Sequence, residues 1–115
     1  MGDCAVLVHN VCITEGGGHG SEEHMKAINN KIEELEKSGK YSRIYGNRAL
    51  KTVGLNGNQR PDITAFRNDG VIEIYEYASP SQAKGYGQNK LVKKMDTMKN
   101  NNRGSEGILY EWGKY

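Results

Sequence analysis

The clearest pattern of hydrophobic and polar positions lies early in the chain and predicts a helix. Its apolar residues are Met25, Ile28, Ile32 and Leu35. They recur every three or four positions, which is the spacing of one face of an amphipathic helix. Ser21 precedes the pattern as an N-cap candidate, and Ser38 and Gly39 end it. We therefore expect a helix from about residue 21 to residue 38.

Later segments are rich in β-branched and aromatic residues, which is typical of strands. These segments are 41–54, with an interruption at Gly46 and Asn47, and then 60–66, 71–79 and 107–112. Asn56 and Gly57 form a dipeptide that favours a hairpin turn. Before the last segment, Leu91, Met95 and Met98 return to helical spacing and predict a second helix from about residue 88 to residue 100.

This order of elements predicts an α+β or mixed α/β domain, with a central sheet of about four to five strands flanked by helices. A length of 115 residues is that of one domain. No segment approaches the roughly 20 apolar residues of a membrane span, so we expect none. Both cysteines lie within the first twelve residues, which excludes a disulfide framework for the body of the domain.

The composition divides the chain into three parts. Residues 1–13 are an apolar leader, and residues 14–20 are a glycine-rich hinge. Residues 21–115 are the single folded domain. Because the hinge separates the leader from the domain, we expect residues 1–13 to contribute little to the core.

Two carboxylates stand out on the predicted strands. Asp62 follows Pro61 at the start of one strand, and Glu76 lies inside the next. Side chains alternate along a strand, so Glu76 shares a face with aliphatic Ile74. A carboxylate buried there is costly unless it is paired or binds a cation. The simpler interpretation is an ion pair with Arg60 or Arg48, whereas Glu73, among tyrosines, lies on the face that better tolerates water.

The first helix and the second helix add further polar candidates. His24 lies about 60° from the centre of the apolar stripe, so it points toward the body of the protein as an acid–base group or a partly buried capping histidine. Residues 84–103 hold six basic residues against one acidic residue, in a chain of net charge +2. Such a helix either contacts phosphates or is a solvated surface.

The segments RPDITAF and GVIEIYEYAS resemble the core of PD-(D/E)xK nucleases. The resemblance implies a restriction-endonuclease-like sheet on which Asp62 and Glu76 bind Mg²⁺ or Mn²⁺. The metal ion then activates water for attack on a phosphodiester. The lysine of this pattern belongs two residues after Glu76, where this chain has Ala78, so Gln82 or Lys84 is expected to replace it. His24 stands where many such nucleases have a glutamate, and Glu22 is nearby.

A second resemblance covers about residues 16–83. The segments GGGHGSEEHMKAINNKIEEL, IYGNRAL, NQRPDI and DGVIEIYEY are similar in order and spacing to C-terminal nuclease domains of bacterial polymorphic toxins, of the Rhs and contact-dependent-inhibition kinds. The resemblance implies that residues 1–13 are the junction with a larger exported carrier. It also implies action in the cytoplasm of the target cell and a cognate immunity protein as partner.

The sequence therefore predicts a metal-dependent nuclease toxin acting on DNA or RNA, including tRNA. Asp62 and Glu76 would bind the metal, and His24 would assist. The residues expected to hold the nucleic acid are Arg60, Lys90, Lys93 and Lys94. Two alternatives remain open at this point: a non-enzymatic binding module of the same fold, and a metal-independent RNase in which His24 and a lysine perform acid–base chemistry.

Overall fold

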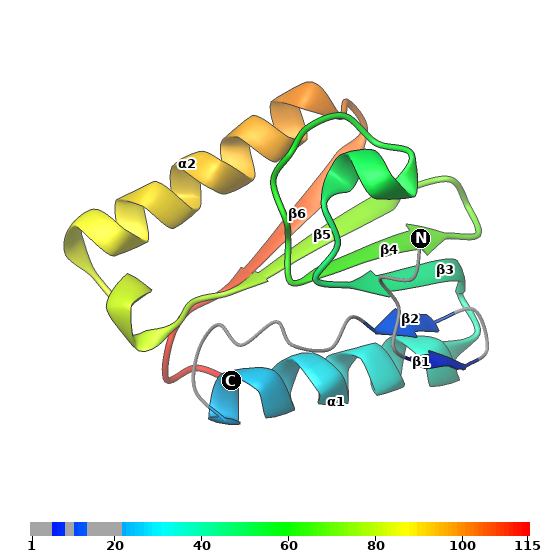
Figure 1. Ribbon diagram of the computed structural model, residues 1–115, viewed down its shortest axis with the longest axis horizontal. Coiled ribbons are helices and arrows are strands. Elements are labelled where there is room, and N and C mark those ends of the chain that lie inside the picture. The colour runs from blue at the N-terminus through cyan, green and yellow to red at the C-terminus, as the bar shows by residue number, and fades with distance from the viewer. Residues whose placement is uncertain (1–5, 9–10, 14–21) are drawn as a thin grey trace.

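The computed structural model describes residues 6–8, 11–13 and 22–115, which form one mixed sheet with a helix on each side (Figure 1). The helices are α1 (Glu22–Ser38) and α2 (Gly85–Asn101). The strands are β1 (Val6–Val8), β2 (Val11–Ile13), β3 (Tyr41–Gly46), β4 (Ile63–Arg67), β5 (Ile72–Tyr77) and β6 (Ser105–Tyr110). Two short 3-10 helices are η1 (Leu50–Val53) and η2 (Pro80–Gln82).

The strands lie in the sheet in the order in which they occur in the chain. Strands β3, β4 and β5 are successively antiparallel, whereas β6 is parallel to β5. A parallel pair requires a crossover connection, and α2 provides it. The predicted fold class, an α+β or mixed α/β domain with a central sheet flanked by helices, is confirmed; with β1 and β2 the sheet has six strands, where four to five were predicted.

Strands β1 and β2 add to the other edge of this sheet, where β2 pairs with β3 in parallel. The leader thus contributes two strands of three residues each. The predicted hinge at 14–20 and the N-cap Ser21 lie outside the described residues. In the part of the chain that is described, neither helix is long and apolar enough to cross a membrane.

The predicted extended segment 41–54 is wrong in its second half. Asn47 adopts a positive φ of 53° directly after β3 and so ends the strand. Leu50 and Val53 are buried from the 3-10 helix η1 instead. The Asn56-Gly57 turn consequently belongs to the long connection between β3 and β4, and it joins no hairpin. The second helix begins at Gly85, three residues earlier than expected, and β6 lies two residues earlier than its prediction.

Each helix covers one face of the sheet with its own core. Helix α1 buries Ile28, Ile32 and Leu35 against one set of strand residues: Ile44, Ile63, Ala65, Tyr75 and Tyr77. On the opposite face, α2 buries Met95 and Met98 against Ile74 of β5 and Leu50 of η1. Both faces of β5 are therefore buried. The expectation that the Glu73 face tolerates water is wrong, because α1 covers that face and Glu73 is only 8% exposed.

Candidate functional site

The two predicted carboxylates lie side by side at one end of the β4–β5 pair. Asp62 immediately precedes β4, and the antiparallel register pairs Ile63 with Tyr75. The two carboxylates lie close enough for the charge of Asp62 to raise the pKa of Glu76. Asp62 is held there by its backbone, which donates to Tyr75 O at 3.0 Å.

Glu76 is buried beside a cation that comes from α2. Its residue is 2% exposed, and Lys94 Nζ lies 2.6 Å from Glu76 Oε2. The contact is an ion pair whose angles fall outside those of a hydrogen bond. Burial raises the pKa of Glu76 to about 7; Lys94 opposes this rise, and the neighbouring carboxylate of Asp62 adds to it. Glu76 therefore titrates near neutral pH.

Lys94 links the helix to the sheet end. Its ammonium also donates to the backbone carbonyl of Arg60 at 3.0 Å, so it contacts the connection that leads into Asp62. Its side chain remains 34% exposed and can reach a bound molecule from the solvent side. The sequence analysis placed Lys94 on a phosphate-binding helix but missed its contact with Glu76. The available signal was its place beside the apolar stripe, three residues after Leu91.

His24 supports Asp62 from the other side of the sheet. Its Nε2 lies 2.7 Å from Tyr77 O, and because a carbonyl only accepts, this nitrogen carries the proton. The same nitrogen is 3.5 Å from Asp62 Oδ2, which also accepts a 2.7 Å hydrogen bond from Tyr77 N. His24 is 4% exposed. These contacts fix the orientation of the Asp62 carboxylate.

The predicted trio of His24, Asp62 and Glu76 is therefore divided between two faces. His24 belongs to α1 and the face that carries Tyr75, whereas Glu76 shares the α2 face with Ile74. Asp62 stands at the sheet end between them. Among the described residues, no three His, Cys, Asp or Glu side chains gather closely enough to hold a metal ion by themselves.

The two residues expected to replace the missing lysine have other roles. Gln82 accepts hydrogen bonds from the backbone and hydroxyl of Ser79, at 2.9 and 3.1 Å, and so caps η2. Lys84 is the exposed N-cap residue of α2. Lys94 is the lysine that the structure brings to Glu76. Glu76 is ion-paired, as the simpler interpretation expected, but its partner is Lys94; Arg60 donates to Asn47 O at 3.1 Å instead.

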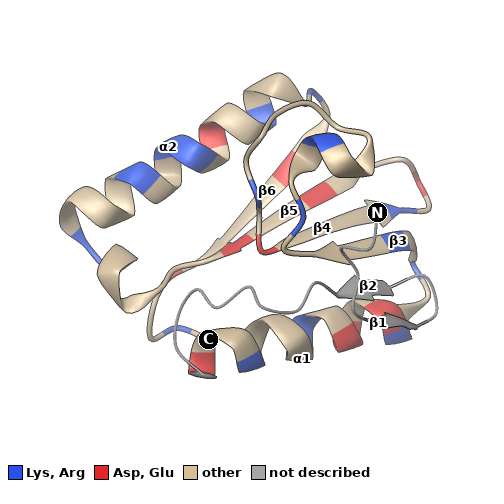
Figure 2. Ribbon diagram, viewed as in Figure 1, with Lys and Arg blue, Asp and Glu red and all other residues tan. Residues whose placement is uncertain are grey.

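The remaining candidates lie around the site. Lys90 and Lys93 are exposed along α2, where Figure 2 shows basic residues following one another. Arg60 is exposed beside the site. Glu22 is the first residue of α1, and its side chain lies outside the described part of the structure.

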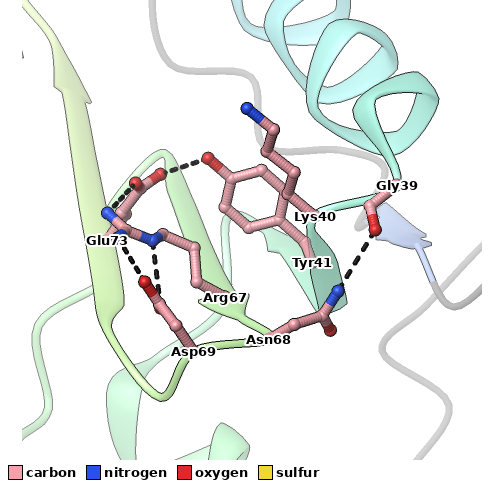
Figure 3. A pocket seen from close by; sticks show the side chains of 7 residues that line it. All are labelled: Gly39, Lys40, Tyr41, Arg67, Asn68, Asp69 and Glu73. Atoms are coloured by element: carbon pink, nitrogen blue, oxygen red, sulfur yellow. Dashed lines mark hydrogen bonds and ion pairs between the residues drawn. The ribbon is translucent and has the colours of Figure 1, made fainter.

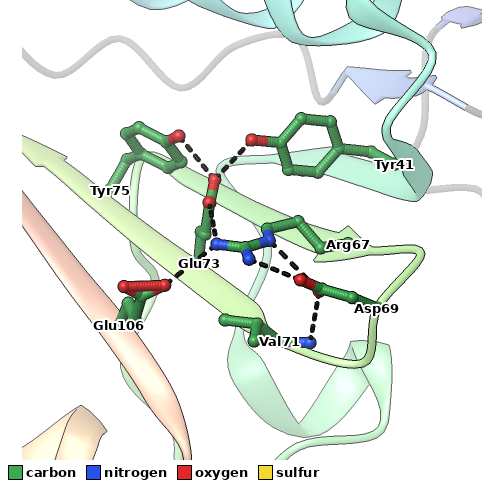
Figure 4. Close-up of polar contacts among 7 residues, drawn as sticks. All are labelled: Tyr41, Arg67, Asp69, Val71, Glu73, Tyr75 and Glu106. Carbon is green, nitrogen blue, oxygen red and sulfur yellow. Dashed lines mark hydrogen bonds and ion pairs between the residues drawn. The ribbon is translucent and has the colours of Figure 1, made fainter.

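A second polar cluster occupies the opposite end of the same strands (Figure 4). Glu73 Oε1 accepts hydrogen bonds from Tyr41 and Tyr75, both at 2.7 Å, and Oε2 accepts from Arg67 at 3.1 Å. Arg67 also binds Asp69 and Glu106. Burial, together with the hydrogen bond to Glu73, raises the pKa of Tyr41 to about 12. The sequence analysis missed this network.

The same end carries a cavity of about 610 Å³ (Figure 3). Its lining consists of Gly39, Lys40, Tyr41, Arg67, Asn68, Asp69 and Glu73. Both carboxylate oxygens of Glu73 and the guanidinium of Arg67 are already bound to each other or to their neighbours. This cluster is a structural junction between β3, β4 and β5. At the other end, the buried Oε2 of Glu76 forms an ion pair with Lys94 but accepts no hydrogen bond among the described residues. The candidate site is accordingly Asp62, Glu76 and Lys94.

Comparison with family models, with curated proteins and with solved structures finds no match for this chain. The functional argument therefore depends on the residues of the site.

Proposed function

We propose that this domain is a nuclease that hydrolyses phosphodiester bonds with a divalent metal ion, Mg²⁺ or Mn²⁺. The observation that carries the proposal is the gathering of Asp62, Glu76 and Lys94 at one end of β4 and β5: Lys94 Nζ lies 2.6 Å from Glu76, and the two carboxylates lie close enough to interact. Two carboxylates and one lysine at a sheet end are the elements of a phosphodiesterase site of the PD-(D/E)xK kind. In this chain the lysine comes from the following helix.

The charges of the site fit a divalent cation. When both carboxylates are ionised, Lys94 balances only one of them, and Glu76 is almost fully buried. An uncompensated buried charge is costly, and this cost is reflected in the raised pKa of Glu76. Mg²⁺ is commonly held by one or two carboxylates, with waters and substrate phosphate completing the octahedron. A bound ion would supply an activated water and charge stabilisation at the phosphate.

The protein's own residues have separable roles in this proposal. His24 and Tyr77 hold Asp62 in place through Oδ2. The ammonium of Lys94, half-exposed beside Glu76, orients water or neutralises a phosphate oxygen. Lys90 and Arg60 provide a positive rim for the polyanion.

The burial of His24 disfavours a metal-independent RNase. Its Nε2 proton is committed to Tyr77 O and to Asp62, and the residue is 4% exposed. An acid–base histidine must reach the proton that it transfers. We therefore assign His24 a positioning role.

The biological setting of the proposal comes from the resemblance to polymorphic toxin domains. In that setting the domain is exported as part of a larger carrier and acts in the cytoplasm of a competing cell. A cognate immunity protein protects the producer, and the basic α2 favours an acidic surface on that partner. The proposed substrate is DNA or RNA, tRNA included.

The test is incubation with plasmid DNA and total tRNA in Mg²⁺ or Mn²⁺, with and without EDTA. We expect cleavage of at least one substrate, loss of cleavage on chelation, and a loss of at least about 100-fold in Asp62→Asn and Glu76→Gln. Lys26→Ala is the control, because Lys26 is exposed on the far helix. Cleavage that persists in EDTA contradicts the metal requirement, and no cleavage with any divalent ion leaves a binding module.

A further inference from the structure

An exposed aromatic ring and two lysines form a row on α2 that leads to the candidate site. Tyr86 is 78% exposed, the highest value among the large apolar side chains described. Lys90 Nζ lies 5.4 Å from the centre of the Tyr86 ring, and Lys94 follows one turn later at Glu76. Residues four apart are neighbours on a helix surface, so the three side chains follow one ridge.

The ridge is exposed on a helix that is held firmly by its other side. Leu91, Met95 and Met98 bury the opposite stripe of α2 against the sheet. At the first turn, Gly87 packs so closely on the backbone carbonyl of Ser81 that a Cβ has no room there. Tyr86 therefore exposes its ring at the surface and is not needed for the core. The packing of its neighbours holds its backbone in place.

We propose that Tyr86, Lys90 and Lys94 form a track for an unpaired strand of nucleic acid. A base stacks on Tyr86, and phosphates lie at Lys90 and Lys94. This inference rests on the proposed nuclease function and names its substrate class. Stacking on a surface tyrosine requires an exposed base face, which single strands and loops offer and a continuous duplex does not.

The dimensions of the helix agree with this arrangement. Eight residues separate Tyr86 from Lys94, which is about 12 Å along the helix axis at 1.5 Å per residue. That length corresponds to about three or four stacked nucleotides at 3.4 Å each. The stacked base therefore lies a few nucleotides from the phosphate at Lys94. The positive charge along the ridge complements a phosphate backbone, and Lys93, also exposed on α2, adds to it.

The experiment measures binding separately from cleavage, by fluorescence anisotropy in EDTA. The probes are a labelled single-stranded DNA, the RNA of the same sequence and the corresponding DNA duplex. We expect Tyr86→Ala to weaken binding of at least one single strand by about 5- to 150-fold, the equivalent of stacking one base. Tyr86→Trp should retain that affinity, because it keeps a stacking surface. Val92→Ala, an exposed apolar position elsewhere on α2, should behave as wild type.

The outcomes separate this inference from the proposed function. Unchanged single-strand affinity in Tyr86→Ala overturns the track, even if the enzyme cleaves, and so does an equal loss for single strand and duplex. Ring-dependent binding without any cleavage supports the track and overturns the nuclease. A larger loss for RNA than for DNA, or the reverse, supports the track and identifies which strand it carries.

Discussion

Replacing Glu76 with glutamine should make the domain more stable at alkaline pH while abolishing its proposed activity. Glutamine keeps the shape of the side chain and removes the charge. Lys94 loses its ion-pair partner, but its side chain is 34% exposed and keeps its hydrogen bond to Arg60 O. The substitution therefore removes a buried charge without leaving a buried charge behind.

The magnitude follows from the pKa of Glu76, which is about 7 in the folded protein against an ordinary value of 4.5. Between these pH values the folded chain retains a proton that the unfolded chain has released. The free energy of unfolding of the wild type consequently falls as the pH rises from about 4.5 to about 7. Over this pH range the wild type loses about 3 kcal/mol in its free energy of unfolding. Glu76→Gln should equal wild type at pH 4 and exceed it by about 2 to 3 kcal/mol at pH 8.

The assay is urea unfolding of both proteins in EDTA at several pH values, with Glu111→Gln as the control. Glu111 is exposed, so its replacement should leave the pH dependence unchanged. Addition of Mg²⁺ should then stabilise the wild type and not Glu76→Gln, because a ligand stabilises only the state that binds it. A variant less stable than wild type at pH 8 would refute the reasoning, since the Glu76–Lys94 pair would then stabilise the fold.

Two further predictions concern the rest of the sheet. Glu73→Ala should lower the free energy of unfolding by about 2 to 3 kcal/mol, because it leaves Tyr41, Tyr75 and Arg67 without their buried acceptor. Glu106→Ala is the comparison, because it removes an exposed partner of the same arginine. It should lower the free energy of unfolding by less than about 1 kcal/mol. Equal losses in urea unfolding would contradict the assigned burial. Deleting residues 1–13 removes β1 and β2 and leaves every residue of the two described cores in place, so the melting temperature should stay nearly unchanged. A fall above about 5 °C, roughly 1 kcal/mol, would make these strands part of the stable domain.

The sequence was sufficient for the type and order of most helices and strands after residue 21, because periodicity reports directly on burial. The stripe through Ile28, Ile32 and Leu35 predicted α1, and the run from residue 71 to residue 79 predicted β5. The segment after Gly46 was mistaken for strand because Leu50 and Val53 are apolar in either conformation. The positive φ of Asn47 is what ends the strand and allows the 3-10 helix to follow. The pattern of apolar residues gives no information about this backbone angle.

The candidate site was predicted in part, for a related reason. The strand start at Pro61 and the alternation along the next strand predicted Asp62 and Glu76. The structure brings the two carboxylates together at the same end of β4 and β5. Lys94 could not be assigned to Glu76 from spacing, because the contact depends on how α2 crosses the sheet after a turn of unknown geometry. The positions near residue 78 that spacing favours are Gln82 and Lys84, which lie in or at the start of the two helical segments that follow β5.

The most direct test of the site compares the cleavage rates of Lys94→Ala and Lys84→Ala with wild type, at saturating Mg²⁺ and on the same labelled strand. The geometry predicts that Lys94→Ala loses at least about 100-fold in the rate of cleavage. Lys84→Ala should stay within a few-fold of wild type, because its side chain is exposed at the start of α2. A large loss in Lys84→Ala together with near wild-type cleavage by Lys94→Ala would contradict the site built from Asp62, Glu76 and Lys94.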